Sequence, residues 1–172
     1  MKIPDNIYLV GSMGAGKTTI GRRLAKALHK DFIDSDAEIE ARTGADISLI
    51  FDYEGEAGFR KRESRMLEEL TDRQNIVLAT GGGAVLDGDN RARLMARGFV
   101  IYLAASLELL VERTARDRKR PLLQTEDRPQ RLKEILDVRD PLYRQVADLV
   151  VSTDRRAAHH LVKDILEHLG ER

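Results

Sequence analysis

Short apolar runs rich in β-branched residues recur along the chain and alternate with longer stretches of helical periodicity. The runs lie at 7–10, around Phe32 and Ile33, and at 76–79, 99–103 and 149–151. Each run has the length and composition of a buried strand. Because helical patterns separate the runs, the alternation predicts a parallel sheet covered by helices.

Two of the helical stretches carry residues that share one helix face. In the first stretch these are Leu107, Leu110, Val111 and Thr114, and in the second Leu161, Ile165 and Leu169. We interpret both stripes as packing surfaces rather than as a cofactor site. No repeat, low-complexity tract or linker interrupts the pattern. We therefore expect residues 1–172 to form a single domain that holds every substrate.

The charge balance points to small-molecule partners. Lys plus Arg and Asp plus Glu both number 29, so the net charge is zero, and no global field attracts nucleic acid or an anionic membrane. The sequence shows no positively charged segment followed by an apolar stretch, as in a secretory signal peptide, and no apolar run of about 18 residues, as in a membrane-spanning helix. We therefore expect a cytoplasmic protein that spans no membrane and binds no nucleic acid. The absence of cysteine excludes disulfide and thiol chemistry.

The strand expected at 7–10 leads into a glycine-rich sequence, GSMGAGKTT, that opens a helical pattern. Its spacing Gly11-x-x-x-x-Gly16-Lys17-Thr18 fits a phosphate-binding loop. Glycines let successive backbone N–H groups turn inward around phosphate oxygens, and the following helix directs its positive dipole end to the same place. Lys17 supplies charge for the β- and γ-phosphates, and the Thr18 hydroxyl is placed to ligate Mg²⁺. The residues expected to bind ATP here are Gly14, Ala15, Gly16, Lys17, Thr18 and Thr19, of which Thr19 is the less suited hydroxyl for the metal.

Two carboxylates follow the second expected strand, in the sequence FIDSDAEIE. In extended backbone Asp34 and Asp36 point to the same side, because side chains alternate along a strand. Two carboxylates close to a triphosphate indicate metal binding or a group that accepts the proton of a substrate hydroxyl. The alternative is that Asp34 or Ser35 caps the following helix, which explains only one of the two carboxylates.

The third expected strand ends in the sequence VLATGGGAVL. Three glycines in a row are costly to order, so Gly81, Gly82 and Gly83 indicate a tight turn or a close approach of backbone to a ligand. Thr80 stands at the strand end where a phosphate-binding enzyme commonly carries a metal-binding aspartate. Asp34 is therefore the best-placed carboxylate for Mg²⁺.

Several arginines are candidates for an anion site, because a planar guanidinium suits a carboxylate or a phosphate. Arg60 lies beside Phe59 and follows a glycine-rich stretch. Arg120 lies in the polar stretch RDRKRPLLQTEDRP, which we expect to be a mobile loop over 116–129. Further candidates are Arg113, Arg116 and Arg139. The four histidines, His29, His159, His160 and His168, show no metal-ligand spacing and are interpreted as structural.

Six sequence elements together resemble the shikimate kinase family. They are GSMGAGKTTIGRRLA, FIDSDAEIE, EGEAGFRKRE, LATGGG, RKRPLL and RDPLYRQVA, in that family's order over residues 7–154. The resemblance implies an α/β P-loop fold of the adenylate-kinase-like type, with a five-stranded parallel sheet in the order 2-3-1-4-5 flanked by helices. It also implies a mobile lid at about 116–129 and a substrate-binding helical region at about 35–65. The implied reaction transfers the γ-phosphoryl group of ATP, with Mg²⁺, to the 3-hydroxyl group of shikimate.

The resemblance also implies a shikimate site in this chain. Asp36 matches the aspartate that binds the substrate hydroxyls and serves as a catalytic residue. Arg60 and Arg139 match the pair that binds the shikimate carboxylate, and backbone at Gly82 matches a further contact. These roles suit phosphoryl transfer, which depends on alignment and charge stabilisation more than on covalent help.

For the nucleotide, the resemblance implies catalytic roles for Lys17 and Arg120, the second of which reaches the transferring phosphoryl group from the lid. Arg113 matches the arginine that packs against adenine. Thr18 and Asp34 match the groups that hold the hydrated Mg²⁺.

Two other functions remain open at this point. One is another small-molecule kinase of the same fold, such as a gluconate kinase. The other is a module that senses ATP without phosphorylating anything. Lys17, Asp36 and Arg120 are all present, and they favour catalysis, because a sensor could dispense with the last two. We expect the protein to work as a monomer.

Overall fold

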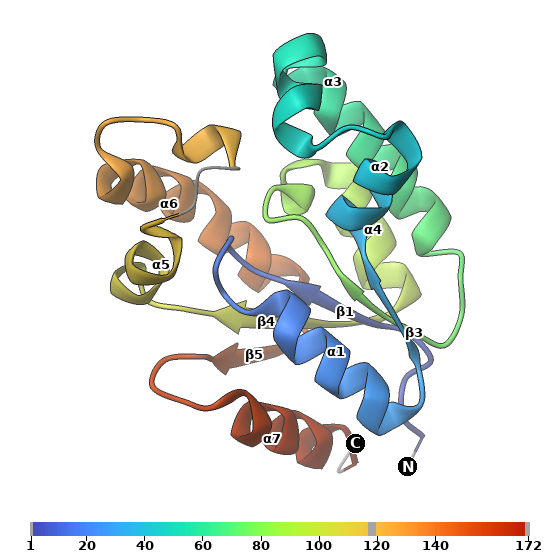
Figure 1. Ribbon diagram of the computed structural model, residues 1–172. Coiled ribbons are helices and arrows are strands. Elements are labelled where there is room, and N and C mark those ends of the chain that lie inside the picture. Colours follow the sequence, from blue (N-terminus) through green and yellow to red (C-terminus); the bar gives the residue numbers. More distant parts are fainter. Residues whose placement is uncertain (1, 117–119, 171–172) are drawn as a thin grey trace.

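The computed structural model describes residues 2–116 and 120–170, and within them five strands form one parallel sheet (Figure 1). The strand order is β2-β3-β1-β4-β5. The bounds are Ile7–Val10 for β1, Asp31–Asp34 for β2, Ile76–Ala79 for β3, Phe99–Ala104 for β4 and Leu149–Ser152 for β5. The predicted strands, their parallel pairing and the implied order are confirmed.

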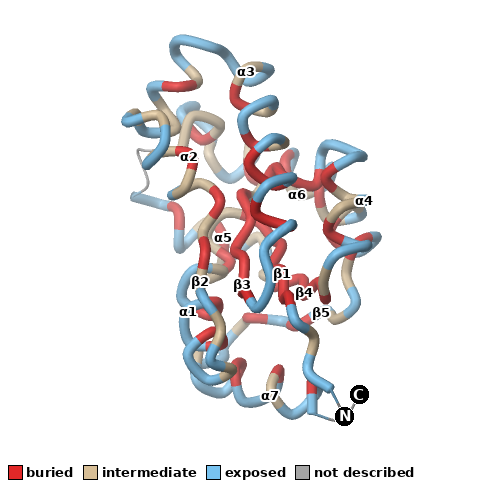
Figure 2. Tube along the Cα trace, turned by 90° about the vertical axis from the view of Figure 1, so that its right-hand side faces the viewer, coloured by how far each residue is buried: buried red, intermediate tan, exposed pale blue. Residues whose placement is uncertain are grey.

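β1 lies at the centre of the sheet, and all four of its residues are buried. Tyr8 and Val10 pack into one apolar cluster, while Ile7 and Leu9 pack into another. Because both faces of a central strand are covered, no position in β1 is left for a solvated side chain, and the sequence shows a continuous apolar run. Figure 2 shows the three inner strands β1, β3 and β4 mainly in red, whereas the edge strands β2 and β5 are partly exposed.

Helices cover both faces of the sheet. Their bounds are Lys17–Leu28 for α1, Ser35–Thr43 for α2, Ile47–Leu70 for α3, Gly88–Arg97 for α4, Leu107–Thr114 for α5, Arg128–Val146 for α6 and Ala158–Gly170 for α7, with 3-10 turns η1 at Ala84–Leu86 and η2 at Pro121–Leu123. α1 and α7 pack on the face of Ile7 and Leu9, and α3, α4 and α6 pack on the face of Tyr8 and Val10. The predicted stripe of α7 is buried in this core, and the stripe of α5 is buried or packed against neighbouring apolar residues.

α3 is sharply kinked where the chain passes through Gly55. This residue has φ 71° and ψ 177°, a conformation that side chains with a Cβ rarely adopt. The kink lets the first part of α3 turn so that the ring of Phe51 packs 5.0 Å from the ring of Phe59. The helical region expected at 35–65 therefore consists of α2 and most of α3, and it stands above the sheet in Figure 1.

The stretch expected to be a mobile loop at 116–129 contains a packed portion. Residues 117–119 lie outside the described residues. After Arg120 the chain forms η2, and Leu123 is fully buried against the side of α6. α6 begins at Arg128, so the last two residues of the expected loop belong to this helix, where a proline in the first turn loses no hydrogen bond. The mobility of the implied lid stays a prediction.

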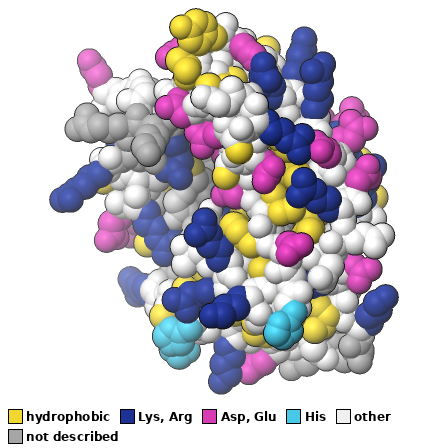
Figure 3. Space-filling model, turned by 45° about the vertical axis from the view of Figure 1, so that its right-hand side comes forward, with side chains coloured by type: hydrophobic (Ala, Val, Ile, Leu, Met, Phe, Trp, Pro, Cys, Tyr) yellow, Lys and Arg dark blue, Asp and Glu magenta, His cyan; other side chains and the backbone are white. Residues whose placement is uncertain are grey.

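The surface carries charges of both signs. On the face shown in Figure 3, Lys and Arg side chains are interspersed with Asp and Glu side chains. This mixing agrees with the zero net charge of the chain. Within residues 2–116 and 120–170, no helix combines the length and the hydropathy that crossing a membrane requires.

The packing of α1 against the sheet depends on Gly21, which has no side chain. A Cβ added at Gly21 would lie 2.5 Å from Cε1 of Phe32 and 3.1 Å from Cδ1 of Leu9. Gly21→Ala should therefore lower the free energy of unfolding by about 1–3 kcal/mol, the usual cost of overpacking, when measured by urea denaturation. Gly170→Ala is the matched control, because a Cβ there would meet no atom within 4 Å. Equal stabilities of the two variants would contradict this packing argument.

Candidate functional site

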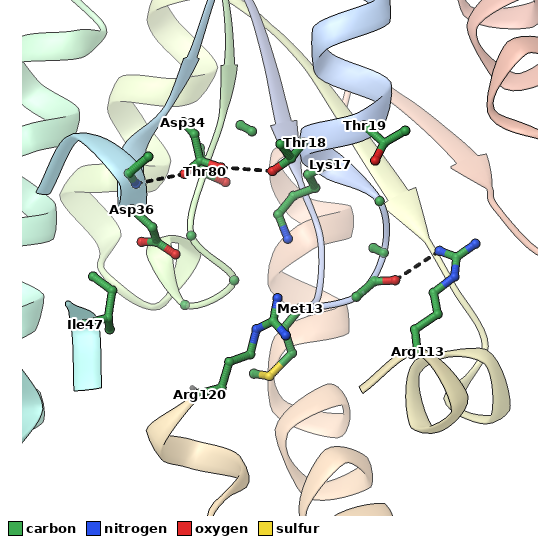
Figure 4. A pocket seen from close by; sticks show the side chains of 18 of the residues that line it. Met13, Lys17, Thr18, Thr19, Asp34, Asp36, Ile47, Thr80, Arg113 and Arg120 are labelled. Atoms are coloured by element: carbon green, nitrogen blue, oxygen red, sulfur yellow. Dashed lines mark hydrogen bonds between the residues drawn. The ribbon is translucent and has the colours of Figure 1, made fainter. Parts of the chain in front are cut away.

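A cavity of about 630 Å³ lies at the carboxyl ends of β1, β2 and β3 (Figure 4). The phosphate-binding loop forms one side, and the glycines after β3 and side chains of α2, α3 and α6 form the other sides. In Figure 1, α2 and α3 stand on one side of this edge of the sheet, and α5 and α6 stand on the other. Ligands of open parallel sheets bind at this edge, so the cavity is the expected place for a site.

The phosphate-binding loop takes the conformation that its glycines permit. Gly14 has φ 83° and Gly16 has φ 98°, both in the left-handed region, and α1 begins at Lys17. The start of α1 lines the cavity. The free N–H groups of this first turn make the place suited to an anion. From α5, Nη1 of Arg113 donates a hydrogen bond of 3.0 Å to the carbonyl of Gly14, which fixes Arg113 at the rim of the loop.

Lys17 folds back over its own loop. Its Nζ donates hydrogen bonds to the carbonyls of Gly11 and Ser12, the second at 2.9 Å. Burial lowers the pKa of Lys17 to about 8, and the nearby charge of Asp36 acts in the opposite direction. Figure 4 shows the Lys17 ammonium directed into the cavity, with the Arg120 guanidinium opposite it.

Asp34 performs two functions at the start of α2. Its Oδ1 accepts a hydrogen bond of 3.1 Å from the N–H of Ala37 and so caps the helix, while its Oδ2 accepts one of 2.9 Å from the Thr18 hydroxyl. The prediction that Asp34 and Asp36 share a face of extended backbone is wrong, because this cap ends the strand and Asp36 lies in the first turn of the helix. Both carboxylates nevertheless line the cavity.

Asp36 is in an unusual environment for a carboxylate. Its Oδ1 is buried and accepts no hydrogen bond. Burial, with the charges of Glu63 and Asp34 adding to it, raises the pKa of Asp36 to about 7, while the positive charges of Lys17 and Arg60 oppose the change. A carboxylate with such a pKa is a better proton acceptor at neutral pH than an ordinary aspartate.

The three glycines after β3 approach the charged side chains closely. A Cβ on Gly81 would lie 2.7 Å from Oδ1 of Asp36, and a Cβ on Gly83 would lie 2.5 Å from both Nη atoms of Arg60. At Gly82 the Cβ would lie 3.4 Å from Nη1 of Arg139. The expected approach of this backbone to a ligand stays a prediction, and the observed close neighbours are side chains of the site, for which Gly81 and Gly83 leave the space.

Arg60 and Arg139 reach these glycines from two different helices, α3 and α6. Arg60 makes an ion pair of 2.9 Å with Glu63, which is almost completely buried, and its guanidinium lies 5.3 Å from the ring centre of Phe59. Arg139 is only 4 % exposed, and burial lowers its pKa, with the positive charge of Arg60 adding to this effect. Two guanidinium groups thus meet at consecutive glycines, an arrangement suited to an anion.

The remaining candidates lie at different distances from this centre. Arg120 lines the cavity, and burial lowers its pKa while the charge of Asp36 raises it. Thr19 is exposed and lines the cavity beside Thr18. Thr80 donates a hydrogen bond of 2.9 Å to the carbonyl of Leu9, so its hydroxyl holds two strands together. The part of the chain that the structure describes contains no group of three or more His, Asp or Glu side chains that could hold a metal ion.

Some residues that contact the arginines and glycines of the site were not predicted as site residues from the sequence. Among them are Ser35, Glu63 and Tyr143. Glu63 lies one helical turn after Arg60 and Tyr143 lies one turn after Arg139, so each shares a helix face with an arginine that was predicted. Ser35 is fully buried, and its Oγ accepts a hydrogen bond of 3.0 Å from the N–H of Gly81.

Comparisons with known proteins point to one family. The family model described as shikimate kinase matches residues 13–170. Curated relatives named shikimate kinase include one from Methylococcus capsulatus, 57 % identical over 96 % of this chain and 93 % of its own length. Another from Vibrio parahaemolyticus is 56 % identical over 97 % of each chain.

Solved structures agree with this result. A shikimate kinase from Acinetobacter baumannii in complex with shikimate superposes with a TM-score of 0.95 at 53 % identity, covering 97 % of this chain and 93 % of that one. A gluconokinase from Sinorhizobium meliloti has a TM-score of 0.60 at 18 % identity, covering 99 % of this chain and 94 % of that one. The second likeness is one of fold alone.

The link between α2 and the glycine segment can be tested through Ser35. Ser35→Ala leaves the buried N–H of Gly81 without its partner, which should lower the free energy of unfolding by about 1–3 kcal/mol. Ser48→Ala in the first turn of α3 is the matched control, because no hydrogen bond of the Ser48 hydroxyl is present. Chemical denaturation of both variants would decide, and a Ser35→Ala variant as stable as the control would show that this contact adds nothing.

Proposed function

The chain belongs to the shikimate kinase family and phosphorylates shikimate, and we propose that its site transfers the γ-phosphoryl group of ATP to the 3-hydroxyl group. The observation that carries this proposal is the meeting of Arg60 and Arg139 at consecutive glycines. Shikimate has one carboxylate and three hydroxyl groups, and two guanidinium groups supply paired, charge-assisted hydrogen bonds for the carboxylate. Backbone at Gly82, which lies between them, is proposed as a further contact.

We assign the hydroxyl end of shikimate to Asp36. Its buried, unpartnered Oδ1 is the kind of acceptor that an incoming hydroxyl group would satisfy. The raised pKa of Asp36 suits a carboxylate that orients the 3-hydroxyl and takes up its proton. The acceptor would then be held at both ends, by a carboxylate at the hydroxyl and by two arginines at the carboxylate.

The triphosphate of ATP is proposed to occupy the loop at the start of α1. Lys17 now donates to two loop carbonyls, and a phosphate in the loop offers it a stronger acceptor with full negative charge. Arg120 lines the same cavity and is placed to stabilise the transferring phosphoryl group. Arg113, which is hydrogen-bonded to the loop at Gly14, is proposed to contact adenine.

Mg²⁺ fits the residues next to the loop. The Thr18 hydroxyl and the Asp34 carboxylate already contact each other at 2.9 Å, and both are oxygen donors of the kind that Mg²⁺ prefers. Thr18 would bind the ion directly and Asp34 would hold its water ligands. The ion supplies positive charge for the β- and γ-phosphates.

We further propose that the protein works as a monomer in the cytoplasm. Each side chain assigned above belongs to one chain, which supports catalysis without a partner subunit. ATP is a cytoplasmic metabolite, which supports that location.

A test of the function is acceptor-dependent ADP formation. ADP release should be at background without an acceptor and with gluconate, should rise with shikimate, and should be abolished by EDTA and restored by Mg²⁺. A coupled spectrophotometric assay measures it. Turnover with gluconate would favour a kinase of different specificity, and ATP binding without any turnover would favour a sensing module.

The carboxylate site is tested by Arg60→Ala and Arg139→Ala. Loss of one partner in a desolvated charge pair costs about 2 kcal/mol or more, so each variant should weaken shikimate binding at least about thirtyfold and leave ATP binding nearly unchanged. The carboxamide analogue of shikimate should bind the wild type poorly and lose little further in either variant. Calorimetric titration measures these affinities, and an amide that binds as well as shikimate would rule out this carboxylate site.

A further inference from the structure

Tyr143 is a buried tyrosine of α6 that lies at the junction of three parts of the site. Its side chain has no exposed surface, and its hydroxyl donates a short hydrogen bond of 2.5 Å to the carbonyl of Gly82. Its ring packs 4.9 Å from the ring of Tyr102 on β4. The phenol ring therefore belongs to the core, while the hydroxyl group belongs to the polar side of the core, next to the glycine segment.

The hydroxyl of Tyr143 also adjoins the acceptor arginine. Arg139 lies one turn earlier on the same helix, and its guanidinium stabilises the ionised form of the Tyr143 hydroxyl, although burial dominates and raises the pKa of this tyrosine. The same Arg139 lies against Gly82, since a Cβ there would be 3.4 Å from its Nη1. Tyr143, Gly82 and Arg139 thus form a compact group in which each member touches the other two.

This group adjoins the phosphate-binding loop. The position of a Cβ on Gly82 is 3.4 Å from the backbone nitrogen of Met13 and 3.7 Å from the carbonyl oxygen of Gly11. The Ser12 hydroxyl lies beside the Tyr143 hydroxyl and also favours its ionised form. However, Ser12 Oγ is buried and makes no hydrogen bond of normal geometry. The loop therefore presents a buried polar atom toward Tyr143 that the present contacts leave unsatisfied.

We propose that the Tyr143 hydroxyl is a positioning group that holds Arg139 and Gly82 against the phosphate-binding loop and thereby makes shikimate binding depend on the nucleotide. The proposal rests on the proposed role of Arg139 in binding the shikimate carboxylate. Tyr143 is not a catalytic residue, because it lies behind Arg139 and the glycine segment and acts through them.

The route from the nucleotide to Tyr143 is short. Lys17 donates to the carbonyls of Gly11 and Ser12, and phosphates that attract Lys17 would free both carbonyls. A movement of the Ser12 backbone would also move the Ser12 hydroxyl, which neighbours the Tyr143 hydroxyl. The Tyr143 hydroxyl in turn contacts Gly82 and Arg139. The two substrates would then share one set of contacts, and shared contacts produce a coupling free energy that acts equally in both directions.

The experiment compares Tyr143→Phe with a matched control. Tyr102→Phe also removes one hydroxyl from a buried tyrosine and breaks a 2.6 Å hydrogen bond, but the partner of the Tyr102 hydroxyl is Asp140 on α6 rather than Gly82. Both variants keep the aromatic stack, so a general weakening of the α6 packing should appear in both. An effect limited to Tyr143→Phe therefore reports the contact with the glycine segment.

Two quantities are measured by calorimetric titration and steady-state kinetics. They are the ratio of shikimate affinities with and without a non-hydrolysable ATP analogue, and the KM and kcat for shikimate. In Tyr143→Phe the ratio should fall toward one and KM should rise about tenfold, the effect of losing one buried hydrogen bond, while kcat changes less than about threefold. Tyr102→Phe should leave the ratio and KM near the wild-type values. Ser12→Ala, which removes the neighbour on the nucleotide side, should lower the ratio as Tyr143→Phe does.

An unchanged ratio in Tyr143→Phe, or an equal fall in Tyr102→Phe, would overturn the inference. Circular dichroism and thermal unfolding would first confirm that each variant is folded. Arg139→Ala separates this inference from the proposed function. If that variant keeps its shikimate affinity, the role of Arg139 fails, and if it loses affinity while Tyr143→Phe changes nothing, only the inference about Tyr143 fails.

Discussion

The glycine segment after β3 leaves the space in which the charged side chains of the site meet. Gly81 faces the carboxyl groups of α2 and α3, Gly82 faces Arg139 of α6, and Gly83 faces Arg60 of α3. A Cβ at Gly81 or Gly83 would collide with these side chains, while a Cβ at Gly82 would make ordinary contact with Arg139 and with the loop. The positions of the charged groups from α2 and α3 therefore depend on residues that contribute only backbone.

The space is filled with polar groups that are not fully satisfied. Oδ1 of Asp36, Oε2 of Glu63 and Nε of Arg60 are all buried without a hydrogen-bond partner. Such groups cost stability in the free protein, and a polar ligand that pairs with them recovers that free energy on binding. The positive charges of Arg60 and Arg139 add to each other, so an anion is the ligand that gains most from this arrangement.

The sequence allowed the sheet and the glycine-rich loop at the start of α1 to be predicted because both depend on local signals. A central strand such as β1 is apolar throughout since both its faces are covered, and the loop motif encodes its own turn through Gly14 and Gly16. The prediction that Asp36 lies in extended backbone was wrong, because Asp34 caps α2 and so ends the strand before Asp36. Glu63 and Tyr143 could not be identified in advance, because their contacts with Gly81 and Gly82 join segments that are distant along the chain.

The double use of the Asp34 carboxylate limits which amino acids can occupy position 34. One oxygen caps α2, and the other receives the Thr18 hydroxyl from α1. Serine or threonine could cap the helix but has no second oxygen for the neighbouring hydroxyl. Glutamate has both oxygens, but its extra methylene moves them away from the N–H of Ala37. The amino acid at position 34 must therefore satisfy two helices at once, because it bonds to Thr18 of α1 and to Ala37 of α2. A substitution that suits only one of these helices loses the contact with the other.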